Sequence, residues 1–538
     1  MKTEQQVPIK PIIWTISGSD CSGGAGIAAD IKTGHALGVE VCHLITANTV
    51  QNSQQLLSVN AISVDILQQQ ATVLIDDKPP SVIKIGLVAN VEQVLWLAKL
   101  LEQYKQLMPN LISVYDPVGQ ASVGGNFSTM TLDQLSPLLR QVDVITPNLL
   151  EAKHLARFAD SIDKNDQNVT AVEVLAKHIH QNFAISAIII KGGHSADEQS
   201  SSDYCYHQLN QLHGKQDNQD KTQTAISYQL STKRIESHYS HGGGCSFATA
   251  LSAFFAQGYL VRDAFTLAKA FISQGLAASE QVSQSFGHQY YGAFEPQGWP
   301  RESQYFAEVV DPLNIEYKNL TTFKSLNLAG KKLGLYPVID SLYWLKRLLP
   351  LGLEIIQLRV KNLVESELEH IIIDAVKLAK DYHTRLFIND YWQLAIKHGA
   401  YGVHIGQEDL QDADLSTIQQ SGIRLGISTH GCYEFLLAQQ LQPSYLAIGA
   451  IFSTKTKDMT GQIQGLDNLR QVLALRPEKI RLQIPVVAIG GINLERAAEV
   501  VATGVESIAV VTALTEAESS HGISAEQAVD KLQAMIND

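Results

Sequence analysis

The sequence predicts two α/β domains in succession: a mostly parallel sheet covered by helices on both faces, and then a closed (β/α)8 barrel. In the first half, short apolar runs such as "IIWTIS", "VIKIGLV", "LISVYDPV", "VDVITPN" and "AISAIIIKGGH" alternate with helix-length spacers, which is typical of a buried parallel sheet. In the second half, eight strand candidates recur within about 200 residues, the lower size range of such a barrel. They are "LGLYPVI", "EIIQLRV", "RLFIND", "YGVHIG", "RLGIST", "YLAIGAIF", "PVVAIGG" and "SIAVVTA".

The pattern changes between the two halves. Residues 286–330 are rich in aromatic residues, Gly and Pro and show no repeating strand and helix, so we place the boundary toward the end of this stretch. We predict a first domain over 1–290, a linker over 291–329 and a second domain over 330–538. Residues 207–229 are rich in Gln, Asn, Asp and Lys without periodicity, which predicts an exposed insertion or hairpin.

Composition excludes several classes of protein. The chain has 538 residues, 45% of them hydrophobic, which is enough for more than one buried core. Its net charge of -13 argues against a nucleic-acid partner, because such proteins carry a basic face. We see no membrane-spanning run, signal peptide, disulfide framework or cysteine zinc spacing. We therefore expect a soluble, cytoplasmic protein without a membrane partner.

The stretch "HGGGCSFATALSAFF" joins a glycine-rich loop to a helix. Glycines 242–244 precede the apolar residues Phe247 and Leu251 at helical spacing. Free amides of the loop and first turn, with the positive end of the helix dipole behind them, would form an anion hole. Such a terminus lowers the pKa of a thiol, so Cys245 is predicted to accept a proton from a hydroxyl that attacks a phosphate. Taken alone, the stretch also fits a buried cysteine behind a flexible loop.

Other polar residues of the first half follow predicted strands, where parallel sheets bind ligands. Asp30 falls on the first turns of a helix after "GSDCSGGAG", and Asp116 ends a strand. Asn148 and Glu151 share one helix face, a spacing suited to a metal near phosphates, although the same pair also fits a helix cap. Lys191, beside two glycines, offers a point charge to a phosphate.

Residues 17–246 resemble the hydroxymethylpyrimidine and phosphomethylpyrimidine kinases of thiamine synthesis, which have the ribokinase-like fold. The resemblance lies in the ordered set "SGSDCSGGAGIAADIKT", "TANTVQNS", "KIGLV", "DPV", "ITPNLLEA", "KGGH" and "HGGGCS" and covers residues 10–290. It implies a three-layer α/β/α domain that uses ATP and Mg2+ to phosphorylate the aminopyrimidine to its phosphate and diphosphate.

The kinase resemblance also implies roles for individual residues. Cys245 would be the catalytic base in an anion hole built by Gly242, Gly243 and Gly244, and Lys191 would lie near the ATP phosphates. Two sets complete the site: Gly18, Asp30 and Gln51 would hold the aminopyrimidine and its hydroxymethyl group, and Asn148, Glu151 and Asp116 would lie near Mg2+. The sequence departs from the family in "GGGC" for Gly-Thr-Gly-Cys, which keeps the amides, and in "GQASVGGN" after "DPV".

Predicted strands of the second half end in residues suited to a diphosphate. Gln357, Arg359 and Lys361 alternate to one side of an extended chain. Asp390 and Asp409 follow the next two strands and can supply oxygen ligands to Mg2+. The last two strands run into "AIGGI" and "AVVTA", the usual location of a phosphate site in these barrels. Each residue also has a simpler interpretation, as a cap, a turn former or a solvated charge.

Residues 330–535 resemble thiamine-phosphate synthases in "QLRVK", "FINDYWQLA", "GVHIGQEDL", "GISTH", "IGAIFSTKTK", "VVAIGGI" and "IAVVTA". In that family the ring nitrogen of hydroxyethylthiazole phosphate attacks the methylene carbon of the pyrimidine diphosphate. The resemblance implies three sets of residues: Arg359, Lys361 and Lys457, with Mg2+ on Asp390 and Asp409, would stabilise the departing pyrophosphate; Gln357, Asn389 and Ser428 would contact the pyrimidine and pyrophosphate; and Thr454, Thr456, Gly491 and Thr512 would hold the thiazole phosphate.

Together the resemblances imply a bifunctional transferase of thiamine biosynthesis, in which the product of the first domain is the substrate of the second. Its partners would be small molecules, namely the aminopyrimidine, ATP and thiazole phosphate. Both families commonly form oligomers, which predicts a homo-oligomer. Three alternatives stay open: a barrel that acts as a thiazole tautomerase, a kinase that acts on pyridoxal, and a domain retained for binding or regulation without turnover.

Overall fold

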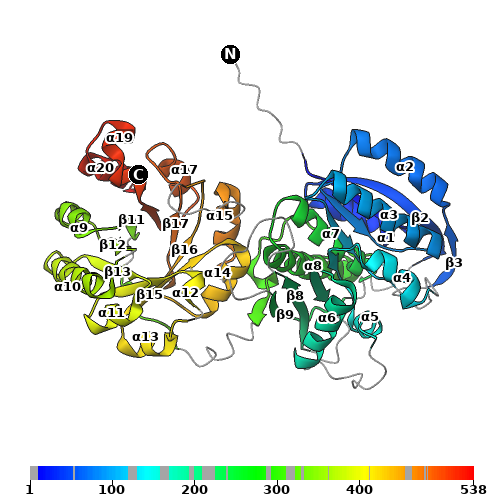
Figure 1. The fold of residues 1–538 in the computed structure, drawn as a ribbon, viewed down its shortest axis with the longest axis horizontal. Coiled ribbons are helices and arrows are strands. Elements are labelled where there is room, and N and C mark those ends of the chain that lie inside the picture. Colours follow the sequence, from blue (N-terminus) through cyan, green and yellow to red (C-terminus); the bar gives the residue numbers. More distant parts are fainter. Residues whose placement is uncertain are drawn as a thin grey trace, which may run out of the picture. The chain divides into compact units, whose positions relative to one another are not determined.

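The computed structural model describes residues 10–52, 55–118, 130–157, 169–192, 199–208, 225–237, 240–285, 293–310, 321–328, 332–361, 363–410, 412–454, 463–477, 480 and 483–537. The chain divides into two compact units. The first unit contains Met1–Pro300 and Tyr305–Pro312, and the second contains Arg301–Gln304 and Leu313–Asp538. Figure 1 shows their elements in chain order from blue to red.

The first unit is built on one sheet, whose described strands run in the order β10-β9-β8-β7-β6-β5-β4-β1-β2-β3. The parallel strands are β1 (Ile12–Asp20), β2 (Glu40–Gln51), β4 (Val82–Ile85), β5 (Ile112–Tyr115), β6 (Val144–Ile145) and β7 (Ala187–Ile190). Antiparallel strands extend both edges: β3 (Leu56–Ala61), β8 (Ser200–Gln208), β9 (Ala225–Lys233) and β10 (Glu308–Val310). The insertion or hairpin predicted over 207–229 lies mostly outside the described residues, which omit 209–224, and its two ends overlap the antiparallel pair β8 and β9.

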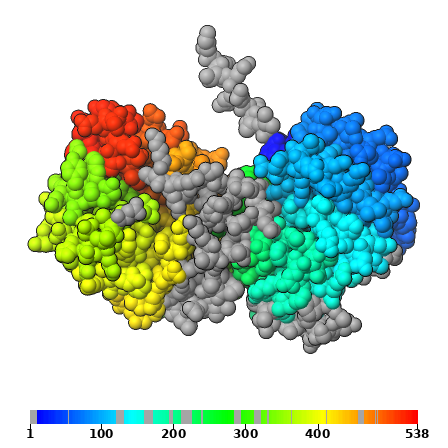
Figure 2. Space-filling view, in the orientation of Figure 1, coloured from blue at the N-terminus to red at the C-terminus, as the bar shows by residue number. Residues whose placement is uncertain are grey.

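Helices cover both faces of this sheet. They are α1 (Gly26–Ala36), α2 (Val64–Asp77), α3 (Val91–Leu107), α4 (Leu132–Leu139), α5 (Leu149–Leu155), α6 (Val169–Phe183), α7 (Gly243–Ala256) and α8 (Val261–Ser285). The short 3-10 helix η1 (Ser303–Tyr305) contains residues of both units. Trp14 and Ile16 of β1 belong to one apolar core with residues of α2, α3, α4 and α6. Helix α1 contacts β1, and α7 contacts both β1 and β4. The predicted three-layer fold is confirmed, and Figure 2 shows α2 and α3, in blue, on its outer surface.

The second unit is a closed barrel of eight parallel strands in chain order, and all eight predicted strands are confirmed. The strands are β11 (Gly334–Ile339), β12 (Ile355–Leu358), β13 (Arg385–Asn389), β14 (Gly402–Ile405), β15 (Arg424–Thr429), β16 (Tyr445–Ile448), β17 (Val486–Ile489) and β18 (Ser507–Val510). β18 pairs with β11 and closes the barrel.

Helices surround the barrel strands (Figure 1). The described helices are α9 (Leu342–Leu348), α10 (Glu365–Asp381), α11 (Trp392–Lys397), α12 (Gln407–Leu410), α13 (Leu415–Ser421), α14 (Gly431–Gln440), α15 (Gly465–Ala474), α17 (Ala497–Val501), α18 (Thr512–Thr515), α19 (Ala517–His521) and α20 (Ala525–Asn537), with the 3-10 helix η3 (Leu349–Leu351). None of the described helices is long and apolar enough to cross a membrane.

Both parts of the predicted linker that the structure describes pack against a unit. β10 pairs with β9 of the first sheet. Residues 321–328 lie against the barrel, where the Phe323 amide donates to the Gln442 carbonyl (3.1 Å) and Leu326 is 1% exposed in the barrel core. Residues 291, 292, 311–320 and 329 of the predicted linker lie outside the described part.

Candidate active sites

A cavity of about 710 Å3 lies at the carboxyl ends of the central strands of the first unit. Loops after β1, β5, β6 and β7 line it, together with parts of β8, β9, α7 and α8. This is the expected place, because parallel sheets bind ligands at the carboxyl edge. The lining includes all but one of the predicted kinase residues: Gly18, Gln51, Asp116, Asn148, Glu151, Lys191, Gly242, Gly243, Gly244 and Cys245.

Lys191 and Asp116 form an ion pair in the cavity wall. Lys191 Nζ donates to Asp116 Oδ1 (2.8 Å), and Thr146 donates to the same oxygen (3.2 Å). Burial lowers the pKa of Lys191, but Asp116 and Glu151 outweigh it and the net shift is upward. The ammonium group therefore stays charged, as a phosphate-binding group must.

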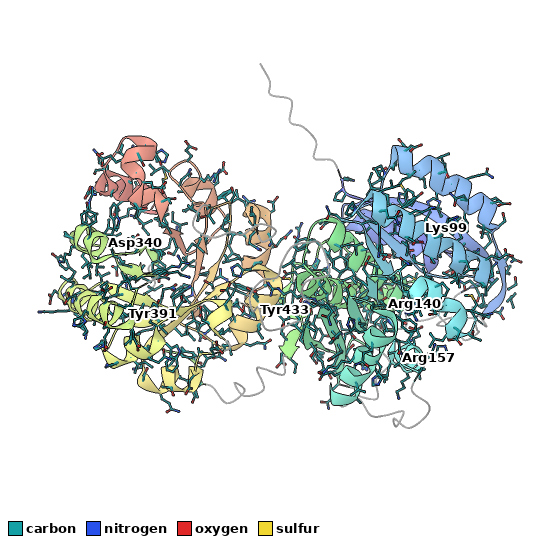
Figure 3. All side chains as sticks on the ribbon, in the orientation of Figure 1. Lys99, Arg140, Arg157, Asp340, Tyr391 and Tyr433 are labelled. Carbon is teal, nitrogen blue, oxygen red and sulfur yellow. The ribbon has the colours of Figure 1, made fainter. Side chains whose placement is uncertain are left out.

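Asn148 and Glu151 form the helix cap that the sequence left open as an alternative. The Asn148 side chain accepts from the Glu151 amide (2.9 Å), and Glu151 Oε2 accepts from the Asn148 amide (2.8 Å). Both residues also line the cavity. This reciprocal capping box fixes the start of α5 at the cavity. Arg157, labelled in Figure 3, follows α5 and pairs with Asp133 of α4 (2.7 Å).

The glycine-rich loop before α7 has the geometry of an anion hole. Gly242 caps α7 with φ of 83°, a left-handed conformation that favours glycine, and a Cβ there would lie 1.9 Å from the carbonyl oxygen of Gly24. The Gly243 amide donates to the Ser240 carbonyl (2.9 Å). Within the described residues, no acceptor takes the amides of Gly244 and Cys245, so these two are left to bind an anion at the helix N-terminus.

The expected fall in the pKa of Cys245 is wrong for the ligand-free site. Burial raises the pKa of this thiol to about 11. Lys84 and the Gly26 amide act in the opposite direction but do not outweigh burial and the carboxylates of Asp30 and Asp116. Loss of solvation thus dominates over the helix terminus.

Asp30 lies behind the cavity wall and is not among the residues that line it. Its side chain is fully buried and accepts from Lys84 Nζ at both oxygens (2.9 Å each), from Thr249 Oγ1 (2.7 Å) and from Thr15 Oγ1. The contact of Asp30 with the aminopyrimidine therefore stays a prediction. Asp30 falls on the face of α1 that packs against the sheet and α7, so its oxygens are taken by protein donors.

Two cavity residues, Asp20 and His241, are absent from the sequence-based set. Asp20 accepts from the amides of Ser22 (2.8 Å) and Ala25 (2.9 Å) and from His241 Nε2 (2.9 Å). Burial raises the pKa of Asp20, but these hydrogen bonds, that of His241 first, bring it well below its usual range. The pair joins the two glycine-rich loops. In the sequence, the pair could have been found because each glycine-rich motif contains one of its two polar residues.

A second pair, Asp203 and Lys269, also lines the cavity and was not predicted. Lys269 Nζ donates to Asp203 Oδ2 (2.9 Å), and Asp203 Oδ1 accepts from the Gly192 amide (2.7 Å). A Cβ on Gly192 would lie 1.9 Å from the Ser202 carbonyl oxygen. The backbone next to Lys191 is therefore held closely against β8. No local motif marks either member, because the two lie 66 residues apart on a strand and a helix.

Predicted charged residues of the barrel meet at the carboxyl ends of β12, β13 and β14. Burial and the nearby Asp409 raise the pKa of Asp390 to about 6, while Lys361 and Arg359 act against that rise. Asp390 adopts a left-handed backbone with φ of 65°. Tyr391, labelled in Figure 3, donates to the Val360 carbonyl (3.4 Å) and so connects the ends of β13 and β12.

A buried hydrogen-bonded chain connects the predicted pyrimidine contacts. His404 Nε2 and Ser428 Oγ are 2.8 Å apart, and His404 Nδ1 lies 2.7 Å from Tyr445 Oη. Tyr445 bonds to Tyr336 (2.7 Å), which accepts from Gln357 Nε2 (3.4 Å). Burial and Arg359 lower the pKa of His404 to about 3, so the imidazole is neutral. Three members were not predicted, because they lie inside strands: His404, Tyr336 and Tyr445. Asn389, the third predicted pyrimidine contact, is not a member of this chain and donates to Asp390.

Glycines after β17 pack tightly at the predicted phosphate end of the barrel. Gly490 and Gly491 have φ of 101° and 64°, and a Cβ on Gly491 would lie 2.5 Å from the Ser453 carbonyl oxygen. Thr512 begins α18 directly after β18. Thr454 ends a described segment, whereas Thr456 and Lys457 lie outside the described residues.

These two sites define a class: a chain that pairs an α/β domain, with a polar cavity at the carboxyl ends of its strands, with a closed barrel that gathers charged residues at the carboxyl ends of its strands. Residues 20–289 match the family described as phosphomethylpyrimidine kinase, and residues 335–514 match thiamine monophosphate synthase. The chain belongs to these two families, one in each unit. It is a bifunctional transferase of thiamine biosynthesis with a kinase and a synthase step.

Individual relatives cover one unit each. The thiamine-phosphate synthase of Yersinia pseudotuberculosis serotype O:1b (strain IP 31758) is 55% identical over 185 residues, which cover 34% of this chain and 84% of that protein. The structure of the pyridoxal kinase from Staphylococcus aureus with pyridoxal is 25% identical with a TM-score of 0.41 and covers 50% of this chain and 89% of that chain. The phosphomethylpyrimidine kinase from Clostridium difficile 630 is 27% identical with a TM-score of 0.38, covering 49% and 99%.

Proposed function

We propose that the first unit phosphorylates 4-amino-5-hydroxymethyl-2-methylpyrimidine twice with ATP, and that Cys245 is the base. In each transfer, the acceptor oxygen bonds to the γ-phosphorus while the bond from that phosphorus to the β,γ-bridging oxygen breaks and ADP leaves. In the first transfer the proton of the attacking hydroxyl passes to the Cys245 sulfur. The observation that carries this proposal is the cavity in which Cys245, the free amides of the loop and Lys191 meet.

Each group has a part in that step. Gly18 and Gln51, on the β1 and β2 side of the cavity, would hold the aminopyrimidine. The amides of Gly244 and Cys245 would bind the transferred phosphoryl group, and Lys191 would bind the ATP phosphates. Donors fixed before the reaction stabilise charge that develops in the transition state without having to reorganise.

Mg2+ fits both sites by the chemistry of their donors. In the kinase, Glu151 and Asp116 would lie near the metal, with phosphate oxygens and water completing the shell; this suits Mg2+, which is held by few carboxylates beside a substrate phosphate. Asp390 and Asp409 form the matching pair in the barrel, close enough for Asp409 to raise the pKa of Asp390. Bound Mg2+ would supply positive charge to phosphate oxygens.

We further propose that the barrel condenses the diphosphate with hydroxyethylthiazole phosphate. The thiazole nitrogen bonds to the pyrimidine methylene carbon while the bond from that carbon to the pyrophosphate oxygen breaks. Arg359 and Lys361, with Lys457, would stabilise the leaving pyrophosphate, and Ser428 would be oriented by the neutral His404. The thiazole phosphate would be held by the remaining predicted set: Thr454, Thr456, Gly491 and Thr512.

Two variants test these assignments on the full chain. Cys245→Ala should stop the conversion of hydroxymethylpyrimidine but leave thiamine phosphate formation from supplied diphosphate intact. Arg359→Met should do the reverse, with accumulation of the diphosphate. Pyridoxal serves as the comparison substrate for the kinase. A Cys245→Ala protein with full kinase activity, or a clear preference for pyridoxal, contradicts the kinase assignment, and synthase activity that survives Arg359→Met contradicts the role of Arg359.

A further inference from the structure

A buried ion pair lies beneath the kinase cavity. Lys84 of β4 and Asp30 of α1 have fully buried side chains, and Lys84 Nζ lies 2.9 Å from both carboxylate oxygens of Asp30. The roles proposed above use neither side chain. Burying two charges is costly, and such a pair is often no more stabilising than apolar residues of similar size. Stability alone therefore does not account for the pair.

Two contacts between α1 and α7 bring this pair close to Cys245. Thr249, one turn after Cys245 on α7, donates to Asp30 Oδ1 (2.7 Å). The Gly26 amide, one turn before Asp30 on α1, is close enough to the Cys245 sulfur to lower the pKa of the thiol. Residues four apart lie on the same helix face, so Cys245 and Thr249 together face Gly26 and Asp30. The ion pair and the thiol are thus held by one contact between α1 and α7.

Charged groups face the thiol from four elements. Lys84 approaches from β4 and Asp30 from α1, while Asp116 follows β5 and Lys191 follows β7. A Cβ on Gly86 would lie 3.1 Å from Lys84 Nζ, so the ammonium group is closely enclosed on that side. Lys191 is already paired with Asp116. Lys84 is paired as well, with Asp30, but unlike Lys191 it is not among the residues that line the cavity, so it is the cation near the thiol that lies outside the substrate cavity.

We propose that Lys84, held by Asp30, is a positioning residue of the kinase reaction whose ammonium group stabilises the negative charge of the Cys245 thiolate. The inference rests on the proposed role of Cys245 as base. The thiol first loses its proton to solvent, and the thiolate then takes the proton of the substrate hydroxyl as the new O–P bond forms. Lys84 touches neither substrate nor nucleotide in this scheme.

Opposite effects of the two members of the pair test this inference. Lys84→Met removes the cation and keeps the length of the side chain, so Cys245 should ionise at higher pH. Asp30→Asn removes the anion and keeps an oxygen for Thr249, so Cys245 should ionise at lower pH. In each variant the pH at which half of Cys245 is ionised should move by about one unit. At a fixed pH below that midpoint, one unit is about a tenfold change in the thiolate fraction.

The measurement is the rate of iodoacetamide alkylation of Cys245 against pH, resolved from the other cysteines by peptide mass spectrometry, in enzyme without nucleotide or Mg2+. The matched control is Lys105→Met, which breaks the Lys105–Asp143 pair (2.7 Å) elsewhere in the same unit and should leave the profile unchanged. Circular dichroism checks folding. If Lys84→Met does not fold, Asp30→Asn decides alone through the direction of its shift.

Displacements in the same direction, or none, overturn the inference, because a purely structural ion pair would affect both variants alike. The kinase pH profile should move with the alkylation profile. If Cys245→Ala keeps its kinase activity while the displacements occur, the role of Cys245 as base fails but the electrostatic effect of Lys84 on the thiol stands. The two failures are thus distinguishable.

Discussion

Gly242 and Gly243 are neighbours in one loop but should respond very differently to alanine. Gly242 has φ of 83°, and its added Cβ would lie 1.9 Å from the backbone oxygen of Gly24. A left-handed backbone costs a non-glycine residue about 1–2 kcal/mol, and the clash forces the loop itself to move. Gly243 begins α7, and its added Cβ would meet no atom within 4 Å, so alanine there should be tolerated or slightly stabilising.

Gly242→Ala should therefore displace the amides of Gly244 and Cys245. Loss of one preorganised donor to a developing anion costs about 10²–10³ in rate, so kcat of the kinase should fall by at least that factor. Gly243→Ala should leave kcat nearly unchanged, because the Gly243 amide already donates to Ser240 and the added Cβ meets no atom of the protein within 4 Å. The assay follows ADP release with hydroxymethylpyrimidine, and synthase activity on supplied diphosphate is the internal control. A Gly242→Ala enzyme as active as wild type would refute the anion-hole geometry.

Three further predictions concern charged groups. Lys191→Met leaves Asp116 buried without its cation, so the free energy of unfolding should fall by about 3–5 kcal/mol. The double variant with Asp116→Asn should recover most of this loss. An unchanged midpoint of thermal unfolding in Lys191→Met would contradict the buried ion pair. Asp409→Asn should raise the Mg2+ concentration for half-maximal synthase activity at least about tenfold and leave the kinase requirement unchanged; an equal shift in both activities would contradict a metal site in the barrel. Arg347 lowers the pKa of Glu526 from 4.5 to about 2, so the pair stabilises the contact of α9 with α20 above pH 4.5 and loses this effect as the pH falls toward 2. Glu526→Gln should lower the free energy of unfolding at neutral pH by about 1 kcal/mol or less. Identical acid-unfolding curves for the variant and the wild type would contradict this prediction.

Strands that are buried on both faces could be predicted from the sequence, whereas β2 and the antiparallel strands at the two ends of the sheet could not. All eight barrel strands are short apolar runs with a clear end. β2 carries polar residues such as His43, Thr46 and Asn48 among its apolar ones, and β3, β8, β9 and β10 are antiparallel extensions at the sheet edges. Alternation with a solvated face leaves no continuous apolar run, so these five strands lacked the signal that identified the others.

Site residues directly after strands were predictable, because parallel strands end at one edge of the sheet. Asp116, Lys191 and the residues of the loop before α7 all line the cavity. Asp30 lies on a helix, where spacing alone does not tell which neighbour its face meets, and it is not among the residues that line the cavity. The direction of the Cys245 pKa shift failed because burial, the largest effect on that thiol, depends on packing that one segment of sequence does not reveal.

The central claim is that one chain makes thiamine phosphate from hydroxymethylpyrimidine. Purified protein should be incubated with hydroxymethylpyrimidine, ATP, Mg2+ and hydroxyethylthiazole phosphate, and the products separated by chromatography. The account predicts thiamine phosphate, pyrophosphate and two ADP for each pyrimidine consumed. Accumulation of pyrimidine diphosphate without thiamine phosphate, even when that diphosphate is supplied directly, would contradict it.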